Sequence, residues 1–253
     1  MSFRPDSPVV DAVLASPNHG ARPRAIDLLL LHYTGMPDAQ GALDWLRDPA
    51  SQVSAHYFVF EDGRVVQLVP EARRAWHAGV ARWADESDVN SSSIGVEIAN
   101  PGHDHGYADF PAVQMQAVAA LCRDIVRRHA VRPERVLAHS DVAPSRKRDP
   151  GEKFDWAWLA RQGVGLWVEP APVEGGEGLR EGDEGRAVVE LQARLADYGY
   201  HVAASGRFDR ATAEAVTAFQ RHFRPARVDG VADASTRETL RRLLAARGLP
   251  DVA

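Results

Sequence analysis

The 253-residue sequence predicts an α/β fold with a mixed central β-sheet flanked by helices, followed by a small three-helix C-terminal domain. The first part rests on short apolar runs that alternate with segments of i, i+3, i+4 apolar spacing. The second part rests on helical periodicity after residue 185, preceded by a segment rich in Pro, Gly and Glu. The predicted units are residues 1–168, a linker over 169–178 and a helical domain over 179–253.

Four segments of the first unit have the apolar composition of buried strands. They span residues 25–34, 55–69, 93–100 and 135–142. The second is expected to be a hairpin that turns at Asp62-Gly63, because Asp-Gly is a favoured two-residue turn. Two further segments, 39–49 and 110–130, carry the spacing of amphipathic helices.

The C-terminal part contains a short internal repeat. Residues 206–212 and 230–236 share the pattern G-x-x-D-x-x-T, and a helical apolar pattern follows each copy. We interpret each copy as a turn glycine followed by an Asp that caps a helix N-terminus. A further helix over 187–199 carries Leu191 and Leu195 on one face. Together these helices predict a core near the lower size limit for independent folding.

Charge and composition exclude several classes of protein. The net charge is −5 and charges of both signs are interspersed, which argues against a nucleic-acid partner. No segment approaches the ~20 apolar residues of a membrane span. The single cysteine, Cys122, lies in a helical pattern and is expected to be a buried structural thiol. No basic stretch followed by an apolar run opens the chain, which predicts a cytoplasmic protein, with a periplasmic location as the alternative if a native export signal has been trimmed.

Two histidines stand where predicted strands run into turns. His32 follows four leucines, and His139 follows a shorter apolar run. A single strand-end histidine is more often structural, but Asp149 adds a carboxylate from a Pro- and Gly-punctuated segment nearby. Two imidazoles and one carboxylate form a three-ligand set that suits zinc and leaves a fourth position for water. This interpretation requires that the two strands be neighbours, which the residues alone leave open.

Two charged residues are further candidates for chemistry. Glu97 lies within an apolar strand, where a carboxylate is costly unless it is paired or reactive. Strand alternation places it opposite its two apolar neighbours, so a solvent-facing glutamate is an equal alternative. Lys147 stands two residues before Asp149, and by itself it is expected to be a solvated loop cation between two arginines.

The other histidines have weaker interpretations. His103 and His105 lie in a Gly-rich polar loop and are expected to be solvated. Four more are expected on loops or polar helical positions without partners, namely His19, His129, His201 and His222.

Several motifs together resemble one family. The segments "LLLHYTG", "SAHYFVFEDGRVVQLVPEARRAWHAG", "SIGVEIAN" and "AHSDVAPSRKRDPGEKFDW" resemble zinc-dependent N-acetylmuramoyl-L-alanine amidases in order and spacing, over residues 26–167. The C-terminal part, with "AFQRHFRP", is similar to the three-helix peptidoglycan-binding domain. This order of modules is that of the AmiD-type members, whose catalytic domain resembles that of AmpD.

The resemblance implies zinc ligands at His32, His139 and Asp149 and catalytic roles for Glu97 and Lys147. It implies hydrolysis of the amide between the lactyl group of N-acetylmuramic acid, or its 1,6-anhydro form, and L-alanine. The implied partners are peptidoglycan or muropeptide fragments, and the oligomeric state is left open. Glu97 would move the proton from water to the leaving amine, and Lys147 would oppose the oxyanion charge.

Two alternatives share these features. A non-catalytic peptidoglycan recognition protein would have the same fold, but such relatives typically lose a metal ligand, and this chain keeps all three candidates. A zinc hydrolase that cuts inside the stem peptide would use the same centre. His77, next to Trp76, is expected to shape the cleft wall rather than bind metal. The C-terminal domain is expected to add polymer affinity or substrate orientation, without a catalytic group.

Overall fold

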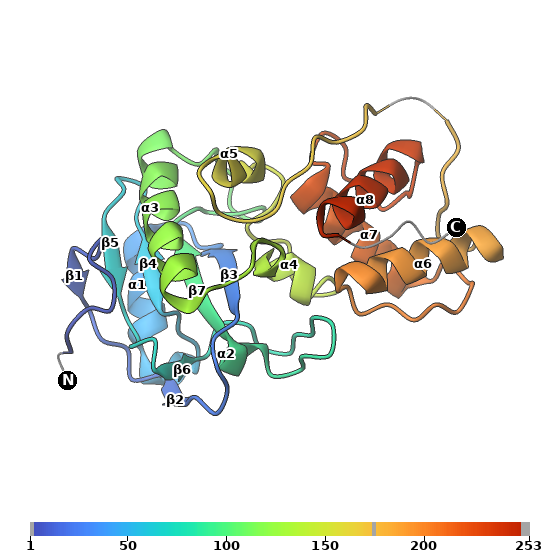
Figure 1. Ribbon diagram of the computed structural model, residues 1–253. Helices are drawn as coiled ribbons and strands as arrows, with labels where there is room; N and C mark the ends of the chain where they lie inside the picture. Colours follow the sequence, from blue (N-terminus) through green and yellow to red (C-terminus); the bar gives the residue numbers. More distant parts are fainter. Residues whose placement is uncertain (1–2, 174–175, 249–253) are drawn as a thin grey trace.

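The computed structural model describes residues 3–173 and 176–248 and has a six-stranded sheet at the centre of its first part (Figure 1). The strand order is β1-β5-β4-β7-β3-β8, and only β4 and β5 pair antiparallel within it, so the sheet is mixed as predicted. These strands are β1 (Ala12–Val13), β3 (Leu28–Tyr33), β4 (Tyr57–Val59), β5 (Val65–Gln67), β7 (Ser93–Ile98) and β8 (Val136–Ala138). A separate antiparallel pair joins β2 (His19–Ala21) to β6 (Arg73–Ala75).

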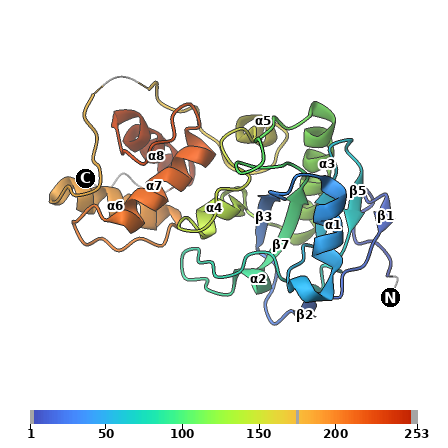
Figure 2. The ribbon, with the colours of Figure 1, turned by 180° about the vertical axis from the view of Figure 1, so that it is seen from behind.

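Helices cover both faces of the sheet. Figures 1 and 2 show α3 (Ala112–His129) on one face and α1 (Ala39–Arg47) on the other. The remaining helices of the first part are η1 (Pro49–Ser51), α2 (Val89–Ser92), η2 (Pro133–Arg135), α4 (His139–Val142) and α5 (Trp156–Arg161). The C-terminal helices are α6 (Arg186–Tyr198), α7 (Arg210–Phe223) and α8 (Ala234–Ala246). No helix among the described residues is long and apolar enough to cross a membrane.

Strand β3 decides which side of the sheet carries the candidate site. Its alternate residues face opposite sides. Leu29 and Leu31 pack in a cluster with α3, whereas Leu28 and Leu30 belong to a cluster with the C-terminal helices. His32 continues the second series, so its side chain lies on the side of the C-terminal helices.

The strand predicted over 135–142 extends four residues too far at its C-terminal end. It ends at Ala138, and α4 begins at His139. The cause is local: Asp141 Oδ2 accepts a hydrogen bond from the backbone nitrogen of Ala138 at 2.8 Å and so caps the first turn of α4. The other predicted strands and helices of this part are confirmed, including the β4–β5 hairpin.

The C-terminal helices pack against the first part through a shared apolar cluster. Trp83 and Val142 lie in this cluster with Tyr200 and Phe219. The Trp83 and Tyr200 rings meet edge to face with centroids 5.0 Å apart. The predicted linker also takes part, since Ala171 is buried and bonds through its backbone to α8. The predicted domain boundaries stay a prediction, and residues 174–175 and 249–253 lie outside the described residues.

Both copies of the G-x-x-D-x-x-T repeat cap a helix, which confirms the prediction. Asp209 Oδ1 accepts from the Thr212 backbone nitrogen at 2.9 Å, and Asp233 Oδ1 accepts from that of Thr236 at 2.7 Å. The capped helices are α7 and α8. Replacing such a cap with alanine typically costs about 1 kcal/mol.

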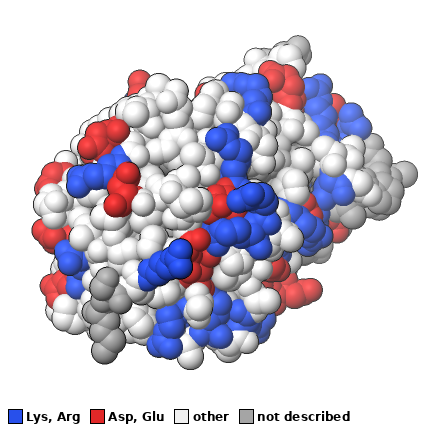
Figure 3. All heavy atoms as spheres, turned by 60° about the vertical axis from the view of Figure 1, so that its left-hand side comes forward, with Lys and Arg blue, Asp and Glu red and all other residues white. Residues whose placement is uncertain are grey.

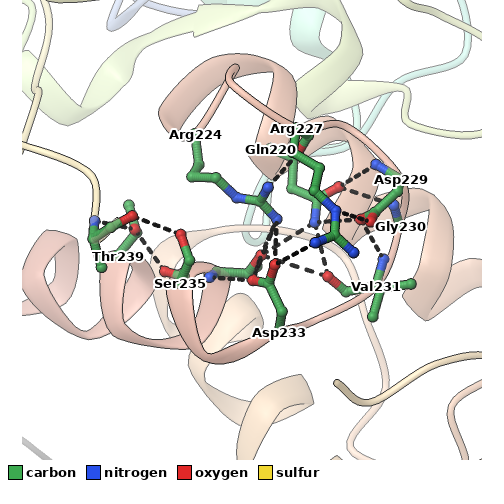
Figure 4. Close-up of polar contacts among 11 residues, drawn as sticks. Gln220, Arg224, Arg227, Asp229, Gly230, Val231, Asp233, Ser235 and Thr239 are labelled. Atoms are coloured by element: carbon green, nitrogen blue, oxygen red, sulfur yellow. Dashed lines mark hydrogen bonds and ion pairs between the residues drawn. The ribbon is translucent and has the colours of Figure 1, made fainter. Parts of the chain in front are cut away.

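A buried glutamine on the preceding helix completes each copy. Gln192 accepts from the backbone nitrogen of Gly206 and Gln220 from that of Gly230, each at 2.9 Å. Each glutamine also donates to the threonine hydroxyl of its motif. Figure 4 shows the second copy, where Gln220 reaches into the loop beside Asp229 and Val231. The repeat is therefore a three-dimensional unit of helix, loop and capped helix.

We expect Gln220→Leu to lower the free energy of unfolding by roughly 1–3 kcal/mol, because it leaves two backbone nitrogens of the loop without their acceptor. They are the nitrogens of Asp229, at a partly buried contact, and of Gly230, at a buried one. Chemical denaturation measures the change. Gln40→Leu, at an exposed position on α1, is the matched control and should change stability by less than about 0.5 kcal/mol. Equal losses in both variants would contradict the role of Gln220.

On the face shown in Figure 3, acidic and basic side chains are interspersed with uncharged surface.

Cys122 is fully buried, as predicted, and burial raises the pKa of its thiol to about 12. It is therefore a packing residue and not a thiolate nucleophile.

Candidate metal centre

The two strand-end histidines lie side by side because β3 and β8 are neighbours in the sheet. The Nδ1 atoms of His32 and His139 are 2.9 Å apart. Asp149 Oδ2 lies 3.1 Å from the first and 2.9 Å from the second. All three residues are buried and form a group that could hold a metal ion. The structure thus brings together the three residues predicted as ligands.

Each histidine ring contacts another part of the protein through Nε2, so its Nδ1 is available to a cation. His139 Nε2 lies 3.0 Å from the carbonyl oxygen of Ala78, which can only accept, so Nε2 carries the hydrogen in the neutral ring. Its Nδ1 then directs a lone pair at His32 and Asp149. Two imidazole nitrogens and one carboxylate oxygen suit a divalent transition metal. The donor set therefore fits a metal ion.

The electrostatics of the group match the protonation states that metal binding needs. Burial, together with the smaller effect of the neighbouring His139, lowers the pKa of His32 to about 4 against the opposing effect of Asp149. Burial alone would raise the pKa of Asp149, but the two histidines hold it well below its usual range. His32 is thus neutral and Asp149 ionised near pH 7, as ligands must be.

His77 is a partner of the centre that the sequence interpretation missed. It lines the cleft as expected, but its Nδ1 also lies 3.0 Å from His32 Nε2 and its Nε2 lies 3.2 Å from Ser93 Oγ. The ring covers Gly95, where a Cβ would stand only 2.4 Å from it. A glycine inside an apolar strand marks such a close approach, and "SIGVEI" contained that signal. His77 orients His32 in the manner of an outer partner of a metal ligand.

Glu97 faces the cleft and not bulk solvent. The parallel register places it beside His32, with which it shares one face of the sheet. Its Oε2 atom is buried and has no hydrogen-bond partner among the described residues. Burial raises the pKa of Glu97 well above its usual range and Asp149 adds to the rise, while Lys147 opposes it. The solvent-facing alternative for Glu97 is therefore wrong.

The candidate centre opens into an elongated cleft. One cavity of about 360 Å³ is lined by His139, Asp149, Glu97 and Lys147. A second of about 560 Å³ continues from it and shares Trp76 and Lys147 among other residues. Large apolar side chains stand exposed along both, with Trp45 50% and Val80 86% exposed. Lys147 thus lies in the cleft with the other candidates and not apart from them.

The prediction that four histidines lack partners is wrong. Their partners come from segments far away in the sequence, which local patterns do not bring together. The contacts are His19 with Arg73, His129 with Glu71, His201 with Arg82 and His222 with Asp141. His103 is half-buried between Tyr33 and Glu152, so its predicted solvation is also wrong, whereas His105 is exposed as expected.

The fold and this centre define a mixed α/β protein with a buried His-His-Asp group that could hold a metal ion and that opens into a cleft. Residues 22–152 match the N-acetylmuramoyl-L-alanine amidase family, and residues 184–240 match a putative peptidoglycan binding domain. The chain is 38% identical to the amidase AmiD of Escherichia coli K12 over 239 residues, which cover 88% of this chain and 84% of AmiD. The chain belongs to the N-acetylmuramoyl-L-alanine amidase family.

Solved structures of relatives agree with this assignment. The chain is similar to E. coli AmiD in complex with its substrate anhydro-N-acetylmuramic acid-L-Ala-D-γ-Glu-L-Lys, with a TM-score of 0.76 and 36% identity over 91% of this chain and 93% of that one. It is also similar to Pseudomonas aeruginosa AmpDh3 in complex with an anhydromuramic pentapeptide, with a TM-score of 0.72 and 30% identity over 92% of this chain and 96% of AmpDh3. Both likenesses extend across the C-terminal helices, so the two-part architecture is shared.

Proposed function

We propose that this chain is a zinc-dependent amidase that hydrolyses the bond between the lactyl group of N-acetylmuramic acid, or its 1,6-anhydro form, and L-alanine in peptidoglycan fragments. The observation that carries the proposal is the convergence of His32, His139 and Asp149 at a cleft that also contains Glu97 and Lys147. The substrate class is supported by AmiD, whose complex with anhydro-N-acetylmuramic acid-L-Ala-D-γ-Glu-L-Lys has a similar overall structure.

Zinc is the metal that this donor set suits best, since two imidazoles and one carboxylate leave an open coordination position. His32, His139 and Asp149 would hold it. When bound, zinc would polarise the substrate carbonyl and make water acidic enough to ionise near neutral pH. The outer contacts of His32 with His77 and of His139 with Ala78 would keep both rings oriented.

Glu97 and Lys147 supply complementary functions in the cleft. The raised pKa of Glu97 suits a group that accepts a proton from the attacking water and returns it to the nitrogen of the leaving L-alanine. The ammonium of Lys147 would oppose the negative charge that develops on the substrate carbonyl oxygen, an effect worth roughly 3 kcal/mol in comparable sites. The exposed apolar walls of the cleft would bind the rest of the substrate.

Two properties of the chain argue against a non-catalytic recognition role. All three candidate ligands lie together, and the Oε2 atom of Glu97 is buried without a hydrogen-bond partner among the described residues. A buried carboxylate oxygen without a partner is costly and is unexpected where no reaction uses it. The C-terminal domain would contribute affinity for peptidoglycan, which its match to a putative peptidoglycan binding domain supports. The cytoplasmic location stays a prediction.

Mass spectrometry of the products tests the proposal. From a muropeptide we expect a sugar product that ends in free N-acetylmuramic acid, and from its anhydro form one that ends in free 1,6-anhydro-N-acetylmuramic acid. In both cases the other product should be an intact peptide that begins with L-alanine. A chelator should stop the reaction, and added zinc should restore it, because the ligand set fits a metal. Release of free amino acids, with L-alanine still attached to the sugar, would instead show cleavage inside the stem peptide. Turnover that a chelator leaves unchanged would contradict the role of the metal.

A further inference from the structure

The segment between the candidate ligands His139 and Asp149 is held by the C-terminal domain at Asp141. Asp141 Oδ1 accepts a hydrogen bond from the Tyr200 hydroxyl at 2.6 Å. Asp141 Oδ2 accepts one from His222 Nδ1, also at 2.6 Å. All three side chains are buried. A buried carboxylate is tolerated when such donors satisfy it, so this contact constrains the positions of both domains.

The same carboxylate is part of the turn that carries a candidate ligand. Asp141 Oδ2 also bonds the backbone nitrogen of Ala138 and so closes the first turn of α4, whose first residue is His139. Helix α4 lies between the sheet and the C-terminal helices and contacts α7 (Figures 1 and 2). A displacement of Asp141 would therefore move the backbone of His139.

A longer ion pair lies near the other end of the segment. Arg221, the residue before His222 on α7, lies with its Nε 3.6 Å from Glu152 Oε2. Glu152 also contacts His103, which bonds the hydroxyl of Tyr33 in the cleft wall at 2.9 Å. Two consecutive residues of one helix thus reach both sides of the ligand-bearing segment.

Aromatic packing fixes the donor on α7. The His222 ring stacks on Trp156 with centroids 3.7 Å apart, and Trp156 begins α5 just beyond the ligand segment. His222 is therefore held between the two domains, and its Nδ1 has one direction in which to donate. The polar contacts between the two domains therefore meet at Asp141, two residues after His139. Adhesion between domains alone would not require a buried polar group at this position.

We infer that Tyr200 and His222 of the C-terminal domain are positioning residues for the metal centre, which they hold in geometry through Asp141. The inference rests on the proposed function for the identity of the ligands. It assigns the C-terminal domain a part in metal affinity and turnover, besides any affinity for peptidoglycan. Neither residue is among those that line the cleft.

Full-length Tyr200→Phe, His222→Leu and the double variant test this inference through zinc affinity, measured by competition with a chromophoric chelator. We expect zinc to bind about 10-fold more weakly in each single variant, the effect typical of lost outer partners of a metal site. The absorption spectrum of the cobalt-substituted protein should change, and kcat on a soluble muropeptide should fall more than KM rises. His222→Asn, which keeps an N–H donor near the Nδ1 position, should recover part of the affinity.

Tyr198→Phe is the matched control. Tyr198 is buried in the same apolar cluster, but its hydroxyl makes no hydrogen bond to any described residue. This variant should keep the zinc affinity and cobalt spectrum of the unaltered protein. Melting temperatures establish that each variant is folded, and Tyr200→Phe, which removes a single oxygen atom, keeps the test valid if His222→Leu does not fold.

Two outcomes would overturn the inference. One is a folded Tyr200→Phe protein with unchanged zinc affinity, spectrum and kcat, which would limit the contact to domain adhesion. The other is an equal loss in Tyr198→Phe, which would assign the effect to general loosening of the interface. A protein that binds zinc but does not cleave muropeptides would contradict the proposed function, and the affinity comparison would still decide the role of Tyr200.

Discussion

Replacing His139 with alanine should remove stoichiometric zinc and reduce amidase activity to the uncatalysed background. The reason is geometric: His139 Nδ1 lies 2.9 Å from both His32 Nδ1 and Asp149 Oδ2, so its loss leaves only two of the three donor atoms. Elemental analysis of the purified variant measures the metal, and hydrolysis of a soluble muropeptide measures the activity. The sheet should persist, because its apolar clusters do not depend on a metal.

A second histidine provides the control for this substitution. His105 is exposed in the loop that follows β7, and His105→Ala should keep both zinc and activity. Circular dichroism of both variants shows whether the fold is retained. Full zinc occupancy in a folded His139→Ala protein would refute the proposed ligand set. Lost metal with retained turnover would show that the reaction does not use the centre.

The ligand triad could be predicted because its signals are local. His32 and His139 each end an apolar run, and Asp149 follows in a turn-rich segment, so residue type and position sufficed to select them. Their convergence requires that β3 and β8 be neighbours, although more than 100 residues separate the two histidines along the chain. Only the resemblance to a known family supplied that adjacency, since strand order is set by the packing of the whole sheet.

The outer contacts of the centre could not be predicted in the same way. His77 reaches His32 from a loop after β6, and it fits there because Gly95 leaves room for its ring. Asp141 and His222 meet across 81 residues of chain. Such pairs have no period or fixed spacing, so a pattern search treats each member as an isolated polar residue.

The interface between the two parts shows a further limit of composition. The predicted linker over 169–178 is rich in Pro and Gly, yet Ala171 within it is buried and bonds to α8, and Trp167 and Val168 just before it pack against the shared cluster. The complementary surface includes Trp83, a loop residue with no apolar periodicity around it. Short apolar stretches that fill a gap between domains therefore resemble linkers in sequence.

Glu97→Gln and Lys147→Ala should both retain zinc and lose most turnover, on the order of 100-fold or more for each. Glutamine keeps the shape of Glu97 but cannot accept the proton, and alanine removes the charge that opposes the developing oxyanion. Because both losses act on the transition state, kcat should fall more than KM rises. Steady-state kinetics on a soluble muropeptide, with zinc content measured in the same samples, gives both quantities.

The location of Glu97 makes its substitution the sharper test of the two. Its Oε2 atom is buried and has no partner among the described residues, so Glu97→Gln breaks no hydrogen bond of that atom, and it removes a carboxylate whose pKa is raised by burial and by Asp149. The variant should therefore be at least as stable as the unaltered protein, while Glu61→Gln, at an exposed position, should change neither stability nor rate. A stable but inactive Glu97→Gln protein would separate catalysis from folding at this residue. Near-normal rates would return Glu97 to a structural role and leave the proton transfer without a base from this chain.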